Sequence, residues 1–114
     1  MKTIIAGSRS ITDYEIVKKA IETSGFNISI VVSGTANGVD KLGERYAKEY
    51  HKKIKRFPAD WNTHGKKAGY LRNTQMAEYA DACIIVWDGI SKGSIHMYNI
   101  AMDKGLEVYM YVVE

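Results

Sequence analysis

The stretch SIVVSGTANGVD, residues 29–40, decides the fold: a short apolar run passes through a polar, glycine-containing turn into a segment of helical periodicity. Consecutive apolar, β-branched residues are typical of a strand that is buried on both faces. The apolar residues that follow, Val39, Leu42, Tyr46 and Tyr50, recur at the spacing of one helix face. The stretch therefore predicts a strand, a tight turn and a helix, which begin a βαβ unit.

The same alternation extends through the rest of the chain. Strand-like apolar runs occur at residues 3–6, 29–32, 54–57, 82–87 and 108–113, with helical periodicity between them. This order predicts an α/β fold in which helices cover both faces of one parallel sheet. Right-handed crossovers give a doubly wound, Rossmann-like sheet of about five strands, for which we expect the order 3-2-1-4-5.

Local signals predict where the helices begin and end. Thr12, with Glu15 three residues later, predicts a capping box at the start of the first helix, and Gly25 predicts its end. The third helix is expected from about residue 66 to 79 and the fourth from about 94 to 104. Residues 58–65 are expected to form the longest irregular segment.

Size and composition bound the organisation of the chain. Its 114 residues, 46% hydrophobic and 25% charged, predict one soluble domain spanning 1–114. The single cysteine, Cys83, lies in an apolar run, so we expect an inert thiol and a cytoplasmic, reducing setting. No apolar stretch approaches the roughly 20 residues of a membrane span, and no group of His, Cys and carboxylates has metal-ligand spacing. We therefore expect no membrane, metal or cofactor, and the eight tyrosines leave amphipathic surface for a homodimer interface.

Three polar, glycine-containing loops follow strands at one edge of the predicted sheet: residues 7–10, 33–40 and 88–94. Each leads to a helix N-terminus, where unpaired N–H groups and the helix dipole favour an anion, and glycine lets the backbone approach phosphate oxygens. One such loop alone is better explained as an ordinary tight βα turn. Three together favour a phosphate site at the switch point between the first and fourth strands. None contains the GxGxxG or P-loop pattern, which argues against a typical NAD dehydrogenase or ATPase.

The segment 58–73 brings further side chains to this edge. Trp61 is a candidate for stacking on a base, with a loop anchor on the core as the alternative. Arg72 is a candidate for bidentate phosphate binding, with an ion pair to Asp60 or Asp88 as the alternative. The candidate ligand-binding residues are Gly7, Ser8, Arg9, Gly34, Thr35, Ala36, Asn37, Gly38, Asp40, Asp60, Trp61, Arg72, Asn73, Asp88, Gly89, Ser91, Lys92, Gly93 and Ser94.

In these motifs the chain resembles the YspA/cpYpsA-related group of the SLOG superfamily. The likeness extends over nearly the whole length and rests on Gly7-Ser8-Arg9, residues 33–40, the block from 58–61 to 72–73, and Trp87-Asp88-Gly89 with Ser91, Gly93, Ser94 and His96. The resemblance implies a Rossmann-like fold that binds nucleotides or their derivatives, including ADP-ribose-related signals in some branches. We therefore expect a small phosphate-bearing nucleotide or nucleotide-derived ligand, held by a sensor, carrier or sequestering module.

One related branch implies an enzyme. In the LOG phosphoribohydrolases, an Arg and a Glu after a Gly-Thr turn cleave an N-glycosidic bond. Arg72 matches that Arg and Gly93-Ser94 match the turn, but Met97 stands in place of the Glu, which argues against nucleotide hydrolysis. If the chain were an enzyme, Asp40 at a helix N-terminus is expected to stay ionised, and Asp88 would be the better acid if burial raises its pKa.

A second branch implies single-stranded nucleic-acid binding. The DNA-processing protein A family shares a pattern like residues 33–40. Here the net charge is only +3, and Lys48, Lys52, Lys53 and Lys55 lie off the predicted site. A solvated surface explains these lysines equally well, so nucleic acid is not the expected partner.

Overall fold

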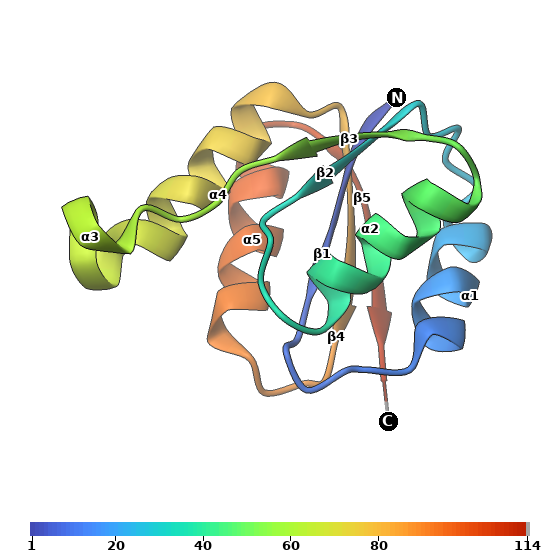
Figure 1. Ribbon diagram of the computed structural model, residues 1–114, viewed down its shortest axis with the longest axis horizontal. Coiled ribbons are helices and arrows are strands. Elements are labelled where there is room, and N and C mark those ends of the chain that lie inside the picture. The colour runs from blue at the N-terminus through green and yellow to red at the C-terminus, as the bar shows by residue number, and fades with distance from the viewer. Residues whose placement is uncertain (114) are drawn as a thin grey trace.

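The computed structural model describes residues 1–113 and contains one five-stranded sheet (Figure 1). The strands are β1 (Lys2–Gly7), β2 (Ile30–Ser33), β3 (Lys53–Arg56), β4 (Ala82–Trp87) and β5 (Glu107–Val112). The helices are α1 (Tyr14–Ser24), α2 (Val39–Glu49), α3 (Trp61–His64), α4 (Ala68–Tyr79) and α5 (Lys92–Asp103), with a 3-10 turn, η1 (Gly65–Lys67), before α4. All neighbouring strands are parallel and their order is β3-β2-β1-β4-β5, which confirms the predicted topology.

Two apolar layers hold the sheet between its helices. Because alternate residues of a strand point to opposite faces, the neighbours Ile4 and Ile5 enter different clusters. Helices α1 and α2 cover the face of Ile5, whereas α4 and α5 cover the face of Ile4 (Figure 1). Residues 82–86 are buried, as expected for a strand covered on both faces. Cys83 among them is fully buried, and this burial raises the pKa of its thiol, which disfavours the reactive thiolate form.

The strand order places the switch point between β1 and β4. The chain leaves β1 toward α1 on one face of the sheet and leaves β4 toward α5 on the other. The two loops therefore diverge and leave a crevice outside the carboxyl ends of the strands. Among the described residues, no helix is both long and apolar enough to cross a membrane.

Three local predictions need correction. The capping box is wrong: α1 begins one residue later, and its N-cap is Asp13, whose carboxylate accepts the N–H of Glu15 at 3.0 Å. The segment 58–65 is not irregular throughout, because Asp60 accepts the N–H of Thr63 at 3.1 Å and starts α3. Helix α5 begins at Lys92, two residues earlier than expected, because Ser91 acts as its N-cap.

Candidate functional site

A cavity of about 430 Å³ occupies the crevice at the carboxyl ends of β1 and β4. It brings together candidate residues from all three loops and from the segment before and within α4. The candidates that line it are Gly7, Arg9, Ala36, Asp40, Trp61, Arg72, Asn73, Asp88, Ser91, Gly93 and Ser94. The predicted convergence of the loops on one edge is therefore present in the structure.

A smaller cavity of about 260 Å³ adjoins the first and is lined by two more candidates, Gly34 and Thr35. The remaining candidates line neither cavity; they are Ser8, Asn37, Gly38, Asp60, Gly89 and Lys92. Sequence analysis missed seven residues of the larger cavity as binding candidates: Ala6, Ser10, Lys66, Gly69, Tyr70, Met76 and Met97. Three of these, at positions 69, 70 and 76, lie on α4 three or four residues from Asn73, so the i, i+3, i+4 spacing was a usable signal, whereas residue 66 lies in η1.

Ser8 joins the three loops instead of lining the cavity. Its buried hydroxyl accepts the N–H of Asp88 at 3.0 Å, and its carbonyl accepts the N–H of Val39 at 3.4 Å. Gly38 makes this close packing feasible, because a Cβ at Gly38 would lie 2.5 Å from the carbonyl oxygen of Ser8 and 2.6 Å from the Cα of Arg9. The loop geometry at the site thus depends on a glycine whose φ is +79°.

We expect Gly38→Ala to lower stability more than Gly89→Ala. Both glycines have positive φ, +79° and +84°, but a Cβ at Gly89 meets no atom within 4 Å, whereas at Gly38 it meets backbone. The shared backbone penalty is about 1 kcal/mol, and the collision adds roughly 1–3 kcal/mol at Gly38 alone. Urea unfolding of the two variants measures the difference. Equal losses would show that the loops do not pack as closely as the structure has them.

Arg72 is anchored on one side and free on the other. Its Nε donates to Oδ1 of Asn73 at 3.0 Å, and its Nη1 donates to the carbonyl of Gly34. It forms no salt bridge with Asp60 or Asp88, so the ion-pair alternative is wrong. A guanidinium has five N–H donors, and among residues 1–113 only these two acceptors are hydrogen-bonded to it. The remaining donors are available to a ligand in the cavity.

Asp40 is the buried carboxylate of the site, with only 5% of its surface exposed. Its Oδ2 accepts the N–H of Ala36 at 3.1 Å. Burial raises the pKa of Asp40 to about 6, against the lowering effects of that hydrogen bond and of the positive charges of Arg72 and Arg9. Sequence analysis did not anticipate this raised pKa, in which desolvation outweighs the hydrogen bond and the two positive charges, although a group with a pKa of about 6 is still mostly ionised at neutral pH. Its carboxyl group can exchange a proton close to neutral pH.

Asp88 behaves in the opposite way. Its Oδ1 accepts the N–H groups of Ser91 and Ile90, both at 2.9 Å, and its Oδ2 accepts the hydroxyl of Ser10 at 2.9 Å. These bonds hold the pKa of Asp88 down at about 2, so burial does not raise it and the condition under which Asp88 would be the better acid is not met. The N–H groups of Ile90 and Ser91 therefore already donate to a carboxylate of their own loop, 88–94. The N–H groups of Lys92 and Gly93, in the first turn of α5, have no acceptor within the helix. They are the donors at this helix N-terminus that can bind an anion.

Two aromatic side chains line the larger cavity. Trp61 and Tyr70 are 51% and 49% exposed, so Trp61 is not an anchor on the core. The Tyr70 ring packs against His96 at a centroid distance of 4.3 Å. Half-exposed rings at the wall of a cavity present apolar faces to whatever enters it.

His96 contacts the site through Asn73, the residue that accepts a hydrogen bond from Arg72. Nδ2 of Asn73 lies 3.1 Å from Nδ1 of His96. Because Oδ1 of Asn73 accepts from Arg72, the amide nitrogen must donate, and Nδ1 of His96 must be the acceptor. Burial lowers the pKa of His96, which favours this neutral form. His96 does not line the cavity, whereas Met97 does, so a thioether occupies the wall where the LOG pattern has its Glu.

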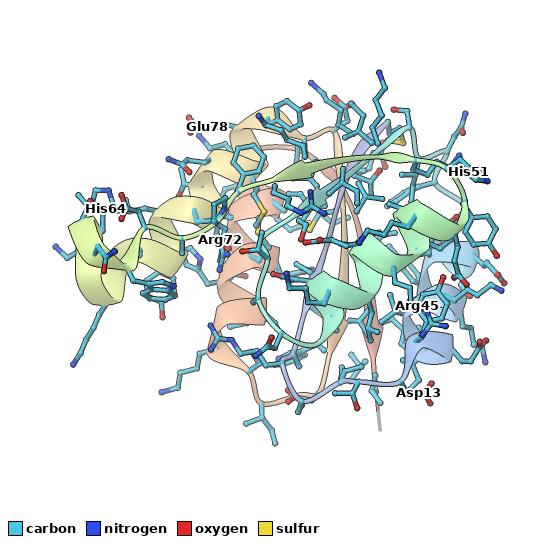
Figure 2. The ribbon with its side chains drawn as sticks, in the orientation of Figure 1. Asp13, Arg45, His51, His64, Arg72 and Glu78 are labelled. Atoms are coloured by element: carbon cyan, nitrogen blue, oxygen red, sulfur yellow. The ribbon has the colours of Figure 1, made fainter. Side chains whose placement is uncertain are left out.

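The other histidines lie away from the cavity. Figure 2 shows His64 at the tip of α3 and His51 beyond the end of α2, both separated from Arg72. Both side chains are exposed. Among the described residues, no group of three or more His, Cys, Asp or Glu side chains is arranged to hold a metal ion.

Comparison with known proteins identifies the family. The profile of the YspA, cpYpsA-related SLOG family matches residues 1–64. The Gene 61 protein of Mycobacterium phage D29 is 32% identical over 117 residues, an alignment that covers 94% of this chain and 93% of that protein. The X-ray structure of DNA processing protein A from Streptococcus pneumoniae has the same fold, with a TM-score of 0.77 and 19% identity over 96% of this chain. The chain spans about half of that structure, 49% of its length. By the profile match and the phage relative, this chain belongs to the YspA, cpYpsA-related SLOG family.

Proposed function

We propose that the protein reversibly binds a phosphate-bearing nucleotide or nucleotide derivative in the 430 Å³ cavity, as a sensor, carrier or sequestering module. One observation carries this proposal: two guanidinium groups and two half-exposed aromatic rings line the same cavity. A cavity of this size lies within the usual range of about 300–1,000 Å³ for small-molecule sites. A nucleotide has the matching chemistry, an anion at one end and a flat base at the other.

The phosphate is expected at Arg72 and Arg9. Neither residue forms a salt bridge within residues 1–113, so neither positive charge is neutralised by a neighbouring carboxylate in contact. Arg72 is held in place by Gly34 and Asn73 before any ligand arrives, which lowers the entropy cost of binding. Such preorganised, charge-assisted hydrogen bonds are the strong ones in anion recognition.

The base is expected against Trp61 and Tyr70. Stacking of a base on an aromatic side chain contributes about 1–3 kcal/mol. Asp40 lies in the same cavity and, when ionised, accepts hydrogen bonds from ribose hydroxyl groups. Together these groups account for all three parts of a nucleotide.

Calorimetric titration with AMP, adenosine and a single-stranded oligonucleotide tests this assignment. We expect AMP to bind and adenosine to bind at least about tenfold more weakly, a loss of about 1.4 kcal/mol, because adenosine lacks the phosphate. The exposed lysines Lys48, Lys53 and Lys55 line neither cavity, so no binding of the oligonucleotide is expected at about 150 mM salt. Tight oligonucleotide binding that falls steeply as salt rises would instead favour a nucleic-acid ligand, as the name of the DNA-processing fold neighbour suggests.

A second candidate function is hydrolysis of the nucleotide's glycosidic bond, and Asp40 is the observation that favours it. A buried carboxyl group with a pKa of about 6 is suited to general acid catalysis near neutral pH. Met97, at the wall of the same cavity, can neither donate a proton nor stabilise a cationic sugar. We therefore expect no free base when AMP is incubated with the protein and the products are separated by chromatography. Repeated turnover that disappears in Asp40→Asn would establish the enzyme instead.

A further inference from the structure

The position of Arg72 depends on an amide that has two possible orientations. Nε of Arg72 donates to Oδ1 of Asn73 at 3.0 Å, although adjacent residues of a helix point about 100° apart and do not ordinarily face each other. Rotation of the Asn73 amide by half a turn would bring its NH2 group against this N–H, so that two donors would meet. The guanidinium is therefore held only while the amide oxygen of Asn73 faces it.

His96 is the residue that decides between these two orientations. Nδ2 of Asn73 lies 3.1 Å from Nδ1 of His96, on the neighbouring helix α5. Only 7% of the surface of Asn73 is exposed, so little water reaches the amide to replace either partner. A neutral Nδ1 accepts from the NH2 side of the amide, which leaves the oxygen for Arg72. A chain of contacts thus connects α5 with the guanidinium and, beyond it, with the carbonyl of Gly34.

Protonation of His96 would remove this preference. The imidazolium ion carries a hydrogen on both ring nitrogens, so its Nδ1–H would meet the NH2 group of Asn73 and favour the reversed amide. In the reversed orientation the amide oxygen accepts from His96, and Nε of Arg72 loses its acceptor. The same proton would therefore release one of the two anchors of the guanidinium.

The surroundings of His96 contain few groups that compete with this effect. From α4, Tyr70 packs on the imidazole ring and Arg72 lies beyond Asn73. Among the described residues, the strand side chains in the apolar layer beneath α5 are uncharged, including the neutral thiol of Cys83. On α5 itself, Lys92 lies one turn before His96.

We propose that His96 is a positioning residue for phosphate binding: its neutral ring holds the Asn73 amide in the orientation that anchors Arg72 at the cavity, and protonation of His96 weakens phosphate binding. This inference rests on the proposed function, because it takes Arg72 as the phosphate ligand. It adds a residue that lines neither cavity and a pH dependence of the affinity for the phosphate.

The first test compares the Kd values of AMP and adenosine for the wild type, His96→Leu and His96→Asn, by calorimetry at about pH 7.5. The ratio of the two Kd values isolates the phosphate, because His96 also packs against Tyr70 and a change in base stacking affects both ligands alike. His96→Leu has no acceptor, so its preference for AMP is expected to fall at least about fivefold. His96→Asn keeps the preference within about twofold, because its amide oxygen can replace Nδ1 as the acceptor.

Asn99→Leu is the matched control for His96→Leu. Asn99 is exposed on the same helix and lines neither cavity, so this variant should prefer AMP as strongly as the wild type does. A purely structural role of His96 predicts that His96→Leu weakens AMP and adenosine equally. That result overturns the proposal.

A pH profile tests the effect of the proton on His96. Asp40, with a pKa of about 6, and the phosphate of AMP titrate in the same range, but they do so in His96→Asn as well. Between about pH 7.5 and about pH 5, the wild type is expected to lose at least about threefold more of its AMP affinity than His96→Asn loses. Parallel profiles of the two proteins overturn the proposal.

Nuclear magnetic resonance of the histidine rings supplies the reciprocal measurement. If protonation of His96 weakens AMP binding, then bound AMP must lower the pKa of His96. The negative charge of a nearby phosphate alone would raise that pKa, so a fall is specific to the contact through Asn73. His51, which lies beyond the end of α2 (Figure 2), is the internal control, and AMP should leave its pKa unchanged. A pKa of His96 that rises or stays constant overturns the positioning role alone, whereas a protein that binds no AMP overturns the proposed function together with it.

Discussion

Asp40→Asn is expected to stabilise the fold by on the order of 3 kcal/mol at about pH 8, because the pKa of Asp40 is raised from 3.8 to about 6 and each unit corresponds to about 1.36 kcal/mol. The asparagine keeps an oxygen that can accept the N–H of Ala36 but carries no charge to desolvate. Urea unfolding of both proteins measures the gain.

The stability difference between Asp40→Asn and the wild type is expected to depend on pH. The folded state holds the proton more tightly than the unfolded state, so protonation favours folding. The wild type therefore gains stability as pH falls through about 6 toward 3.8, and the advantage of Asp40→Asn shrinks over the same window. Asp103→Asn, at an exposed position of α5, should change stability by less than about 0.5 kcal/mol. A destabilised Asp40→Asn at about pH 8 would show that the nearby positive charges and the hydrogen bond stabilise the carboxylate more than burial destabilises it.

A gain in stability on replacing Asp40 would also indicate that this residue has a role in function. A buried carboxylate that lowers stability and lines a cavity is typical of residues retained for activity at the expense of the fold. In this chain Asp40 lines the cavity, and so does Ala36, its hydrogen-bond partner in the loop after β2. We expect Asp40→Asn to weaken nucleotide binding even as it raises the melting temperature.

Arg72→Ala is expected to weaken AMP binding by at least about 30-fold, corresponding to about 2 kcal/mol. Arg72→Lys should be almost as damaging, because one ammonium group cannot keep the contacts to Gly34 and Asn73 and also bind phosphate through a planar fork. The melting temperature should fall only modestly in both variants, because Arg72 lines the cavities outside the apolar core and forms no salt bridge among residues 1–113. Calorimetry and thermal unfolding of the same samples separate the two effects.

Arg45→Ala is the matched control for this pair. Arg45 lies 4.0 Å above the ring of Tyr14, on the α1 and α2 side of the molecule, away from Arg72 (Figure 2). Its removal should leave AMP binding unchanged. If Arg72→Ala binds AMP like the wild type but unfolds far more readily, then Arg72 is a structural residue that only secures the loop after β2.

The fold could be predicted from local patterns because each strand signal agrees with its tertiary setting. The predicted strand at 82–87 has the same first and last residues as β4. The alternation of strands and helices predicts the observed strand order. The convergence of three loops also follows from topology alone. Helix ends were less predictable: at α1, adjacent Thr12 and Asp13 are both good caps, and the sequence does not decide between them.

The electrostatics of the site could not be predicted from the sequence. Asp40 follows a glycine-containing turn and Asp88 follows the end of a strand, so their sequence settings look alike. Burial nevertheless raises the pKa of Asp40, whereas hydrogen bonds lower the pKa of Asp88. These effects depend on which side chain is buried by the fold and which one folds back onto its own loop. The division of the site into two cavities likewise depends on where Trp61 and Arg72 stand in three dimensions.

Chemical-shift mapping of the amide-labelled protein with AMP tests the central claim most directly. Binding in the crevice between β1 and β4 predicts the largest changes at the amides of Gly7, Arg9 and Gly93 and at the indole of Trp61, all of which line the larger cavity. Changes confined to the exposed lysines of β3, with the cavity signals unmoved, would contradict it.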